Sequence, residues 1–258
     1  MAKKIAPVGH EDRLSLVEHL DELRSRIIIA VAAIVVAFSL CAWQNHLILD
    51  IFNQPLPEGQ EPITLSPTEP FLTTITLSLY AAIILALPVV LYQIYAFILP
   101  AFSPTERRVA LPLLLLVPVL FIGGVTFTYF IVLTPAIDFL LNFNSDEFNT
   151  QLRARDYYSF AALLMLALGI LFQIPVGILA ATRLGITTPE QLRKNRRYAI
   201  LAMAVLAALL PTIDPVTLIL EMVPLILLYE LSILLAAAFG RPPAEVAEQV
   251  ASAEGSSS

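Results

Sequence analysis

The sequence predicts an all-α integral membrane protein with six transmembrane helices, several of them kinked by proline, and with both termini in the cytoplasm. Its mean hydropathy is +0.80, and 58% of its 258 residues are hydrophobic against 14% that are charged. This composition is too apolar for a soluble domain of such a length. Six apolar segments are candidates to cross about 30 Å of hydrocarbon, which takes roughly 20 helical residues. They are residues 26–43, 71–98, 109–133, 158–181, 198–210 and 216–239.

The first segment follows an N-terminal stretch, residues 1–25, that we expect to be cytoplasmic and amphipathic. Ser15 followed by Glu18 predicts a capping box that starts a helix at this point. The polar leader before the span is long, which favours a permanent helix over a cleaved signal peptide. One face of the predicted helix is apolar and the other carries acids at the level of the lipid head groups. The apolar face comprises Leu16, Leu20, Leu23 and Ile27, and the polar face comprises Glu18, Asp21, Glu22 and Arg24.

Prolines lie inside or beside most of the later segments, where each removes a backbone hydrogen bond and bends its helix. Two interpretations fit this pattern equally well: ordinary membrane-helix prolines, which are common, and a set of bent helices that build one concave wall. The prolines are Pro88, Pro112, Pro118, Pro175 and Pro224.

The fifth segment, residues 198–210, is too short to span a membrane. About 13 residues at roughly 1.5 Å each reach only about 20 Å. The turn at residues 211–215 should therefore lie below the far membrane surface, where irregular backbone is tolerated only under a cover of protein or water. We interpret the fifth and sixth segments as a helical hairpin with a sunken tip.

Basic residues set the predicted orientation, because cytoplasmic loops are enriched in Lys and Arg. Arg153 and Arg155 fall on the outer side, while residues 44–70 carry no basic residue. Residues 44–70 and 142–156 are therefore expected outside. We expect one membrane domain over residues 1–240 and a disordered cytoplasmic tail over residues 241–258. The basic residues assigned to the cytoplasm are Lys3, Lys4, Arg13, Arg24, Arg26, Arg107, Arg108, Arg183, Arg193, Lys194, Arg196, Arg197 and Arg241.

Composition and missing motifs exclude several classes of function. A net charge of -6 argues against nucleic-acid binding, which needs a basic surface. The single cysteine, Cys41, rules out an internal disulfide or a paired-cysteine metal site, and the histidines are too dispersed for a shared metal site. The chain has no phosphate-binding loop, no HExxH metal pair and no GxSxG nucleophile elbow. We therefore expect no enzymatic activity, no cofactor and no metal.

A few polar side chains lie at or within the predicted membrane region. A charge at the bilayer centre costs at least about 2.5–3.5 kcal/mol, so such groups are usually paired or functional. The structural alternative is an interhelical hydrogen bond for Gln173, an N-cap for Asp214 and a solvated loop charge for Glu106. The set comprises Glu22, Glu106, Gln173, Asp214, Glu221 and Glu230.

Several local motifs, in order along residues 16–236, together resemble the TatC family, the large multi-span subunit of the twin-arginine (Sec-independent) protein translocase. The family often has Glu where this chain has Gln173, which leaves a polar contact but no titrating group at that position. The motifs are HLDELRSR at 19–26, PVVLYQIYAFILP at 88–100, TERR at 105–108, FQIP at 172–175, LGITTPEQLRK at 184–194 and DPVT at 214–217.

The resemblance implies a six-helix, cupped receptor in the bacterial cytoplasmic (inner) membrane that binds the twin-arginine signal peptides of folded cargo. Export of that cargo would be driven by the proton motive force. The implied partners are the signal peptides, TatA-type and TatB-type single-span subunits, further copies of this chain and the lipid bilayer.

The resemblance also assigns roles to individual positions. Carboxylates at Glu22 and Glu106 are expected to form the cytoplasmic signal-peptide site. The other implied residues are Arg24, Leu20 and Phe97 at that site, Gln173 and Asp214 as intramembrane contacts with partners, and Pro55, Phe71 and Tyr129 in and near the outer cap.

Two other classes of function have less support in the sequence. A multi-span secondary transporter of a small cationic substrate would bind that substrate near the membrane midplane, but no internal repeat is evident. An intramembrane hydrolase would need a metal pair, a nucleophile elbow or a close aspartate pair within the spans, and the sequence has none of these.

Overall fold

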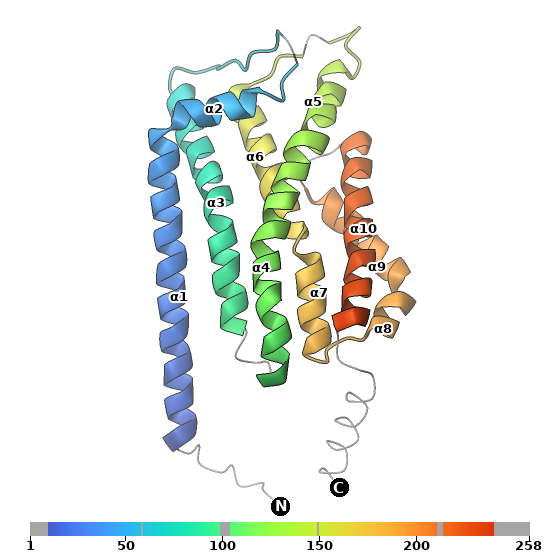
Figure 1. Ribbon diagram of the computed structural model, residues 1–258. Coiled ribbons are helices and arrows are strands. Elements are labelled where there is room, and N and C mark those ends of the chain that lie inside the picture. Colours follow the sequence, from blue (N-terminus) through green and yellow to red (C-terminus); the bar gives the residue numbers. More distant parts are fainter. Residues whose placement is uncertain (1–9, 58, 99–103, 149, 211–213, 240–258) are drawn as a thin grey trace, which may run out of the picture.

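The computed structural model describes residues 10–57, 59–98, 104–148, 150–210 and 214–239, without the side chains of residues 10–18, 98, 104–114 and 239. The described residues are mostly helical, and Figure 1 shows the long helices standing side by side in one bundle. In chain order the helices are α1 (His10–Trp43), α2 (Asn45–Asn53), α3 (Glu69–Ile98), α4 (Pro104–Phe127), η2 (Thr128–Val132), α5 (Leu133–Asn142), α6 (Ala154–Leu171), α7 (Ile174–Arg183), α8 (Pro189–Lys194), α9 (Arg196–Ala208) and α10 (Pro215–Phe239).

Five helical segments of the described chain are long and apolar enough to cross a membrane. Many of their large apolar side chains are exposed on the surface of the bundle, as expected for helices that face lipid. The fifth predicted segment forms α9, which at 13 residues is too short to span alone. The five segments are His19–Trp43, Glu69–Phe97, Leu115–Asn142, Ala154–Arg183 and Pro215–Ala238.

The helices pack in an order that follows the chain only in part. α1 lies along α3, and α3, α4 and α6 pack against one another, while α10 packs on α7 and α9. In Figure 1, α1 begins and α10 ends at the same end of the bundle. We call this end the proximal end, and the opposite end, which α2 covers, the cap end.

α4 and α6 approach each other closely at two glycines. A Cβ added to Gly124 would lie 2.9 Å from the Cα of Gly169, and a Cβ added to Gly169 would lie 2.7 Å from Cε2 of Phe121. Small residues allow this kind of backbone approach between membrane helices. The neighbouring core is centred on α6, where Ala161 and Leu164 are fully buried.

The fourth predicted segment is interrupted where α6 ends and α7 begins. Gln173 is the N-cap residue of α7, and Pro175 occupies the first turn. The missing N–H of a proline costs no helical hydrogen bond at that position. Pro88 and Pro224, by contrast, lie inside α3 and α10, which continue past them.

α2 lies across the cap end, and tyrosine hydroxyls bind its C-terminal carbonyl groups. Tyr129 Oη donates to the carbonyl oxygen of Ile51 at 2.7 Å, and Tyr157 Oη donates to that of Phe52. The last four carbonyl groups of a helix have no partner within the helix. These two hydrogen bonds therefore give partners to two of the last carbonyl groups of α2, and they join α2 to η2 and α6.

Three boundaries correct the sequence prediction. α1 starts at His10, so Ser15 and Glu18 lie inside the helix, because the residues before them extend it. The third segment continues past residue 133 to Asn142, because the π-helical turn η2 links α4 to α5 without ending the helix. Residues 44–70, expected outside and assigned no helical segment from the sequence, contain α2, which long-range packing of Phe52 stabilises.

Two further predictions concern parts of the chain that the structure does not describe. The predicted sunken tip includes residues 211–213, and the predicted tail comprises residues 241–258. Both lie outside the described residues and stay predictions.

Candidate functional site

Glu22 lies on α1 one helical turn before Arg26. Nη2 of Arg26 at 2.6 Å and Nε at 3.0 Å both donate to Oε1 of Glu22. Nη1 of Arg26 donates to Oε1 of Gln93 on α3 at 3.1 Å. The carboxylate predicted to bind a signal peptide is therefore already paired with a guanidinium. The i, i+4 spacing was the sequence signal for this pair, which sequence reasoning missed.

His19 connects Glu22 to Phe97. Its Nδ1 lies 3.7 Å from Oε2 of Glu22. Its ring stacks on that of Phe97, with 4.3 Å between the centroids and 15° between the planes. The structure thus brings together two of the predicted site residues through a histidine that sequence reasoning left out, although it precedes Glu22 by one helical turn.

The other residues predicted for this site are placed differently. Leu20 is 63% exposed, and Arg24 is exposed as well. Arg26, and not Arg24, is the arginine that the structure pairs with Glu22. Glu106 lies in the first turn of α4, but its side chain is outside the described residues. Its approach to Glu22 stays a prediction.

An apolar groove lies between α1 and α3 beside the Glu22–Arg26 pair. Its volume is about 240 Å³. Among the described residues that line it, Arg26 and Gln93 are polar and Phe97 is aromatic. The aliphatic lining comprises Leu23, Ile27, Ala30, Val31, Ile34, Val90 and Ile94.

Gln173 is buried at the break between α6 and α7. Its Nε2 donates to the backbone carbonyl oxygen of Val117 on α4 at 3.2 Å. This is the interhelical hydrogen bond that was expected as the structural alternative at this position. A contact between Gln173 and a partner subunit stays a prediction.

Two of the acids at or within the last helix, Asp214 and Glu230, have structural roles. Oδ1 of Asp214 accepts the backbone N–H of Thr217 at 2.8 Å, so Asp214 caps the start of α10. Glu230 accepts a hydrogen bond from Arg196 on α9 at 2.7 Å. Glu221 is fully buried on α10. Contact of Asp214 with a partner subunit stays a prediction.

Two of the three residues expected in or near the outer cap lie at the C-terminal end of α2. Pro55 is buried just after α2, and Tyr129 donates to Oε1 of Gln54 at 3.1 Å as well as to the backbone of α2. Phe71, near the start of α3, is 69% exposed. The structure therefore brings the first two together and leaves Phe71 on the surface.

An ion pair at the cap end was missed by sequence reasoning. Glu69, only 4% exposed, accepts from Nε of Arg153 at 2.7 Å and from the backbone N–H of Leu65 at 2.9 Å. This hydrogen bond to the carboxylate raises the pKa of the Arg153 guanidinium. The partners are 84 positions apart, so no local pattern could have indicated the pair. It holds the start of α3 to the start of α6.

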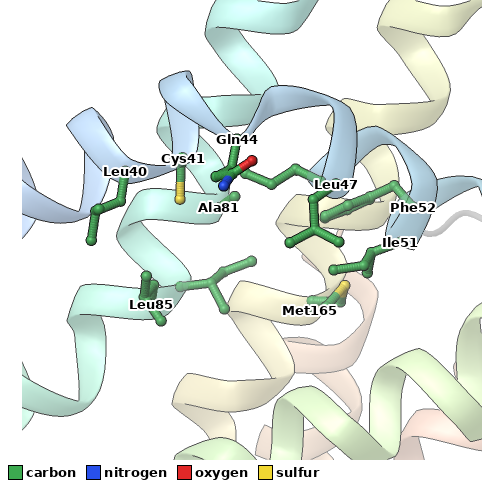
Figure 2. Close-up of a pocket in the computed structure, with 11 residues that line it drawn as sticks. Leu40, Cys41, Gln44, Leu47, Ile51, Phe52, Ala81, Leu85 and Met165 are labelled. Atoms are coloured by element: carbon green, nitrogen blue, oxygen red, sulfur yellow. The ribbon is translucent and has the colours of Figure 1, made fainter.

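A second apolar pocket lies under α2. Figure 2 shows its side chains, which come from α1, α2 and α3 and include Met165 of α6, around a space of about 390 Å³. Gln44 is the polar residue among those that line it. This lining offers no acid to a cationic substrate, so the pocket does not support the small-molecule transporter alternative. No group of three or more His, Cys, Asp or Glu residues in the described part of the chain could hold a metal ion.

The fold and the site define an all-helical, multi-span membrane protein that carries an ion-paired carboxylate at one end of its first helix. Comparison with known proteins identifies the family. The family model of the Sec-independent protein translocase protein (TatC) matches residues 18–224. The chain belongs to the TatC family. Membership makes it a protein-transport subunit and not an enzyme.

Curated relatives are similar in sequence to this chain over most of its length. The Sec-independent protein translocase protein TatC of Magnetococcus marinus is 38% identical over 91% of this chain and 88% of its own length. The Aquifex aeolicus protein is 39% identical over 86% of this chain and 94% of its own. The Escherichia coli protein is 35% identical over 86% of this chain and 88% of its own.

A solved structure has the same fold. A crystal structure of the twin-arginine translocase receptor TatC in DDM is 38% identical, with a TM-score of 0.74. The match covers 87% of this chain and all of that one. The predicted family and the helical multi-span fold are therefore confirmed.

Proposed function

We propose that this protein is the receptor and core subunit of a twin-arginine translocase and that Glu22 binds the paired arginines of a signal peptide. The observation that carries the proposal is the hydrogen bonding of Glu22. Its carboxylate already accepts two N–H groups of one guanidinium, which is the chemistry that an arginine of a signal peptide would present. The related crystal structure is described as a receptor.

Glu106 is proposed as the second carboxylate of the site. Only residues 99–103 separate the end of α3, which carries Phe97, from the start of α4, so Glu106 belongs to the same end of the bundle as Phe97. Leu20 would contribute an exposed apolar contact for the peptide, and Arg24 would adjust the local charge. Transport of folded cargo would draw on the proton motive force.

We further propose that the proximal end faces the cytoplasm of a bacterium and that the membrane is the inner membrane. α1 begins and α10 ends at this end (Figure 1). The basic residues Arg193 and Lys194 lie in the last turn of α8, whereas Arg153 lies at the cap end. Enrichment of Lys and Arg on one side favours that side as cytoplasmic. In this topology α9 is the fifth of six membrane helices in chain order and α10 is the sixth, and residues 1–240 form one membrane domain.

The proposed partners are TatA-type and TatB-type single-span subunits and further copies of this chain. Gln173 and Asp214 are the proposed intramembrane contacts. Both are buried, and each has an oxygen, Oε1 of Gln173 and Oδ2 of Asp214, without a hydrogen-bond partner among the described residues. A buried polar oxygen of this kind gains free energy when a neighbouring subunit supplies a donor.

The function is tested by the binding of a labelled twin-arginine signal peptide to the purified protein in nanodiscs. The parent should bind this peptide in preference to a twin-lysine version, and binding should weaken with added salt. Glu22→Gln and Glu106→Gln should each weaken binding while leaving thermal stability unchanged. Glu190→Gln, on the exposed surface of α8, is the control for loss of one negative charge. Equal binding of twin-arginine peptide by parent and by the Glu22→Gln, Glu106→Gln double variant would refute the proposed site.

A further inference from the structure

We propose that the corner between α8 and α9 binds the head group of an anionic phospholipid in the membrane leaflet at the proximal end. Four cations lie within five residues at this corner, Arg193, Lys194, Arg196 and Arg197. The inference goes beyond the proposed function, because it concerns a different surface of the protein from the Glu22 site. It depends on the proposed function only in taking α9 as a membrane helix.

The corner is held in place by contacts with α10, beside which α8 and α9 lie in Figure 1. Tyr229 Oη donates to the backbone carbonyl oxygen of Leu192 at 2.9 Å. Nη2 of Arg196 donates to Glu230 at 2.7 Å, and a capping box at Thr188 starts α8. A site on a backbone that is already fixed loses little conformational entropy when a ligand binds.

The cations of the corner differ in what they contact. Arg196 lies on the same face of α9 as the buried Met203 and Ala207, seven and eleven positions later. Its guanidinium is paired with Glu230. The other three cations are exposed, and within the described part of the chain none of them forms a salt bridge. Three positive charges at the corner can therefore receive an anion.

Arg197 begins a stripe of exposed residues along α9. Leu201 and Val205 follow it at intervals of four positions and are exposed, so all three lie on one face of the helix. The guanidinium carbon of Arg197 lies 4.8 Å from the centroid of the Tyr198 ring. Tyrosine is enriched where membrane helices cross from water into hydrocarbon. In the proposed topology the corner therefore lies at the level of the lipid head groups.

A phospholipid presents the matching groups in the same order, an anionic phosphate followed by apolar acyl chains. Arginine binds phosphate through its planar fork and lysine as a point charge. The apolar stripe that follows Arg197 would contact the acyl chains of the same lipid molecule. A free phosphate would use the cations and leave this stripe without a role. Complementarity of charge and of apolar surface together favour a lipid as the occupant.

The test measures binding of phosphatidylglycerol to the full-length protein by native mass spectrometry, with phosphatidylcholine of the same acyl chains as the neutral comparison. The parent should bind phosphatidylglycerol more tightly. Arg197→Gln should weaken this binding by about fivefold, the effect of one basic residue near an anionic surface. A triple variant that also carries Arg193→Gln and Lys194→Gln should lose about tenfold or more, with binding of phosphatidylcholine unchanged.

Two variants serve as controls. Arg197→Lys keeps the positive charge and should keep most of the affinity for phosphatidylglycerol. Arg155→Gln removes one exposed cation at the cap end and should have a smaller effect than Arg197→Gln. Equal losses in Arg155→Gln and Arg197→Gln would overturn the inference, because the effect would then be one of overall charge. A triple variant that prefers phosphatidylglycerol as strongly as the parent would also overturn it.

The predicted C-terminal tail is the competing occupant, because it follows α10 and carries Glu245, Glu248 and Glu254. Replacement of these three acids by glutamine in the full-length chain should leave the affinity for phosphatidylglycerol unchanged. A gain of about tenfold or more would refute the lipid as occupant, since the tail would then be covering the cations.

Signal-peptide binding by the same variants separates this inference from the proposed function. The triple variant should bind a twin-arginine peptide like the parent, and Glu22→Gln should keep the preference for phosphatidylglycerol. If Glu22→Gln abolishes peptide binding while the triple variant keeps the lipid preference, the inference fails and the proposed function stands. If the triple variant loses the lipid preference while Glu22→Gln binds the peptide like the parent, the inference stands and the proposed role of Glu22 fails.

Discussion

Gly169 on α6 faces Phe121 on α4, and Gly169→Ala should destabilise the helix bundle. The added Cβ would lie 2.7 Å from Cε2 and 3.1 Å from Cδ2 of Phe121, and 3.0 Å from Cγ2 of Val125. Carbon atoms in ordinary contact are about 3.5–4.0 Å apart. Phe121 is only 1% exposed, so its ring has no free space to enter. Overpacking of this kind costs about 1–3 kcal/mol.

Thermal unfolding in detergent measures this effect. A loss of about 2 kcal/mol lowers the Tm of a chain of this length by about 4–8 °C. Gly177→Ala on α7 is the matched control, because a Cβ at that position meets nothing within 4 Å. It should be neutral or slightly stabilising, since alanine favours a helix over glycine.

A double-mutant cycle identifies the clash as the cause. Phe121→Leu shortens the side chain that Gly169→Ala would strike, so the two changes together should cost less than the sum of their separate effects. Equal Tm values for Gly169→Ala and Gly177→Ala would refute the reasoning. Strict additivity of Gly169→Ala and Phe121→Leu would show that the strain lies elsewhere.

Three further predictions follow from single contacts and from the proposed topology. Gln173→Leu removes the hydrogen bond to Val117, so it should lower the free energy of unfolding by about 0.6 kcal/mol and weaken crosslinking to partner subunits, whereas Gln173→Glu should be tolerated. If the leucine variant exports cargo and forms crosslinks like the parent, Gln173 has only a packing role. Arg153→Gln should lower the Tm more than Arg155→Gln, since it leaves the Glu69 carboxylate without its cation, and equal Tm values would mean that the pair is dispensable. Single cysteines in a cysteine-free background should react with an impermeant thiol reagent on intact cells at position 60 but not at position 190, and the reverse pattern would overturn the proposed orientation.

The positions of the membrane helices could be predicted from the sequence because the length of an apolar segment depends only on consecutive residues. The first predicted segment ends at residue 43, where α1 also ends, and the sixth differs from α10 by one residue at its start. The shortness of the fifth segment was also visible, since α9 has 13 residues. α2 was missed because it is a short helix held at the cap end by contacts with distant tyrosines.

The polar contacts needed the tertiary structure. Tyr157 binds the backbone of Phe52, 105 positions away, and the Glu69–Arg153 pair joins segments 84 positions apart. No periodicity along the chain encodes such distances.

The sequence alone determined that this chain is a helical multi-span membrane protein of the TatC type, and that Glu22 is an acid at the start of its first span. The local i, i+4 spacing supplies its partner Arg26, and the tertiary structure decided which side chains of α3 support this pair. Packing of α1 along α3 brings Gln93 against Arg26 and Phe97 against His19. The physical reason is that an i, i+4 ion pair forms within one helix, whereas the remaining hydrogen bond of Arg26 needs an acceptor from another helix, which only the packing of α1 against α3 supplies.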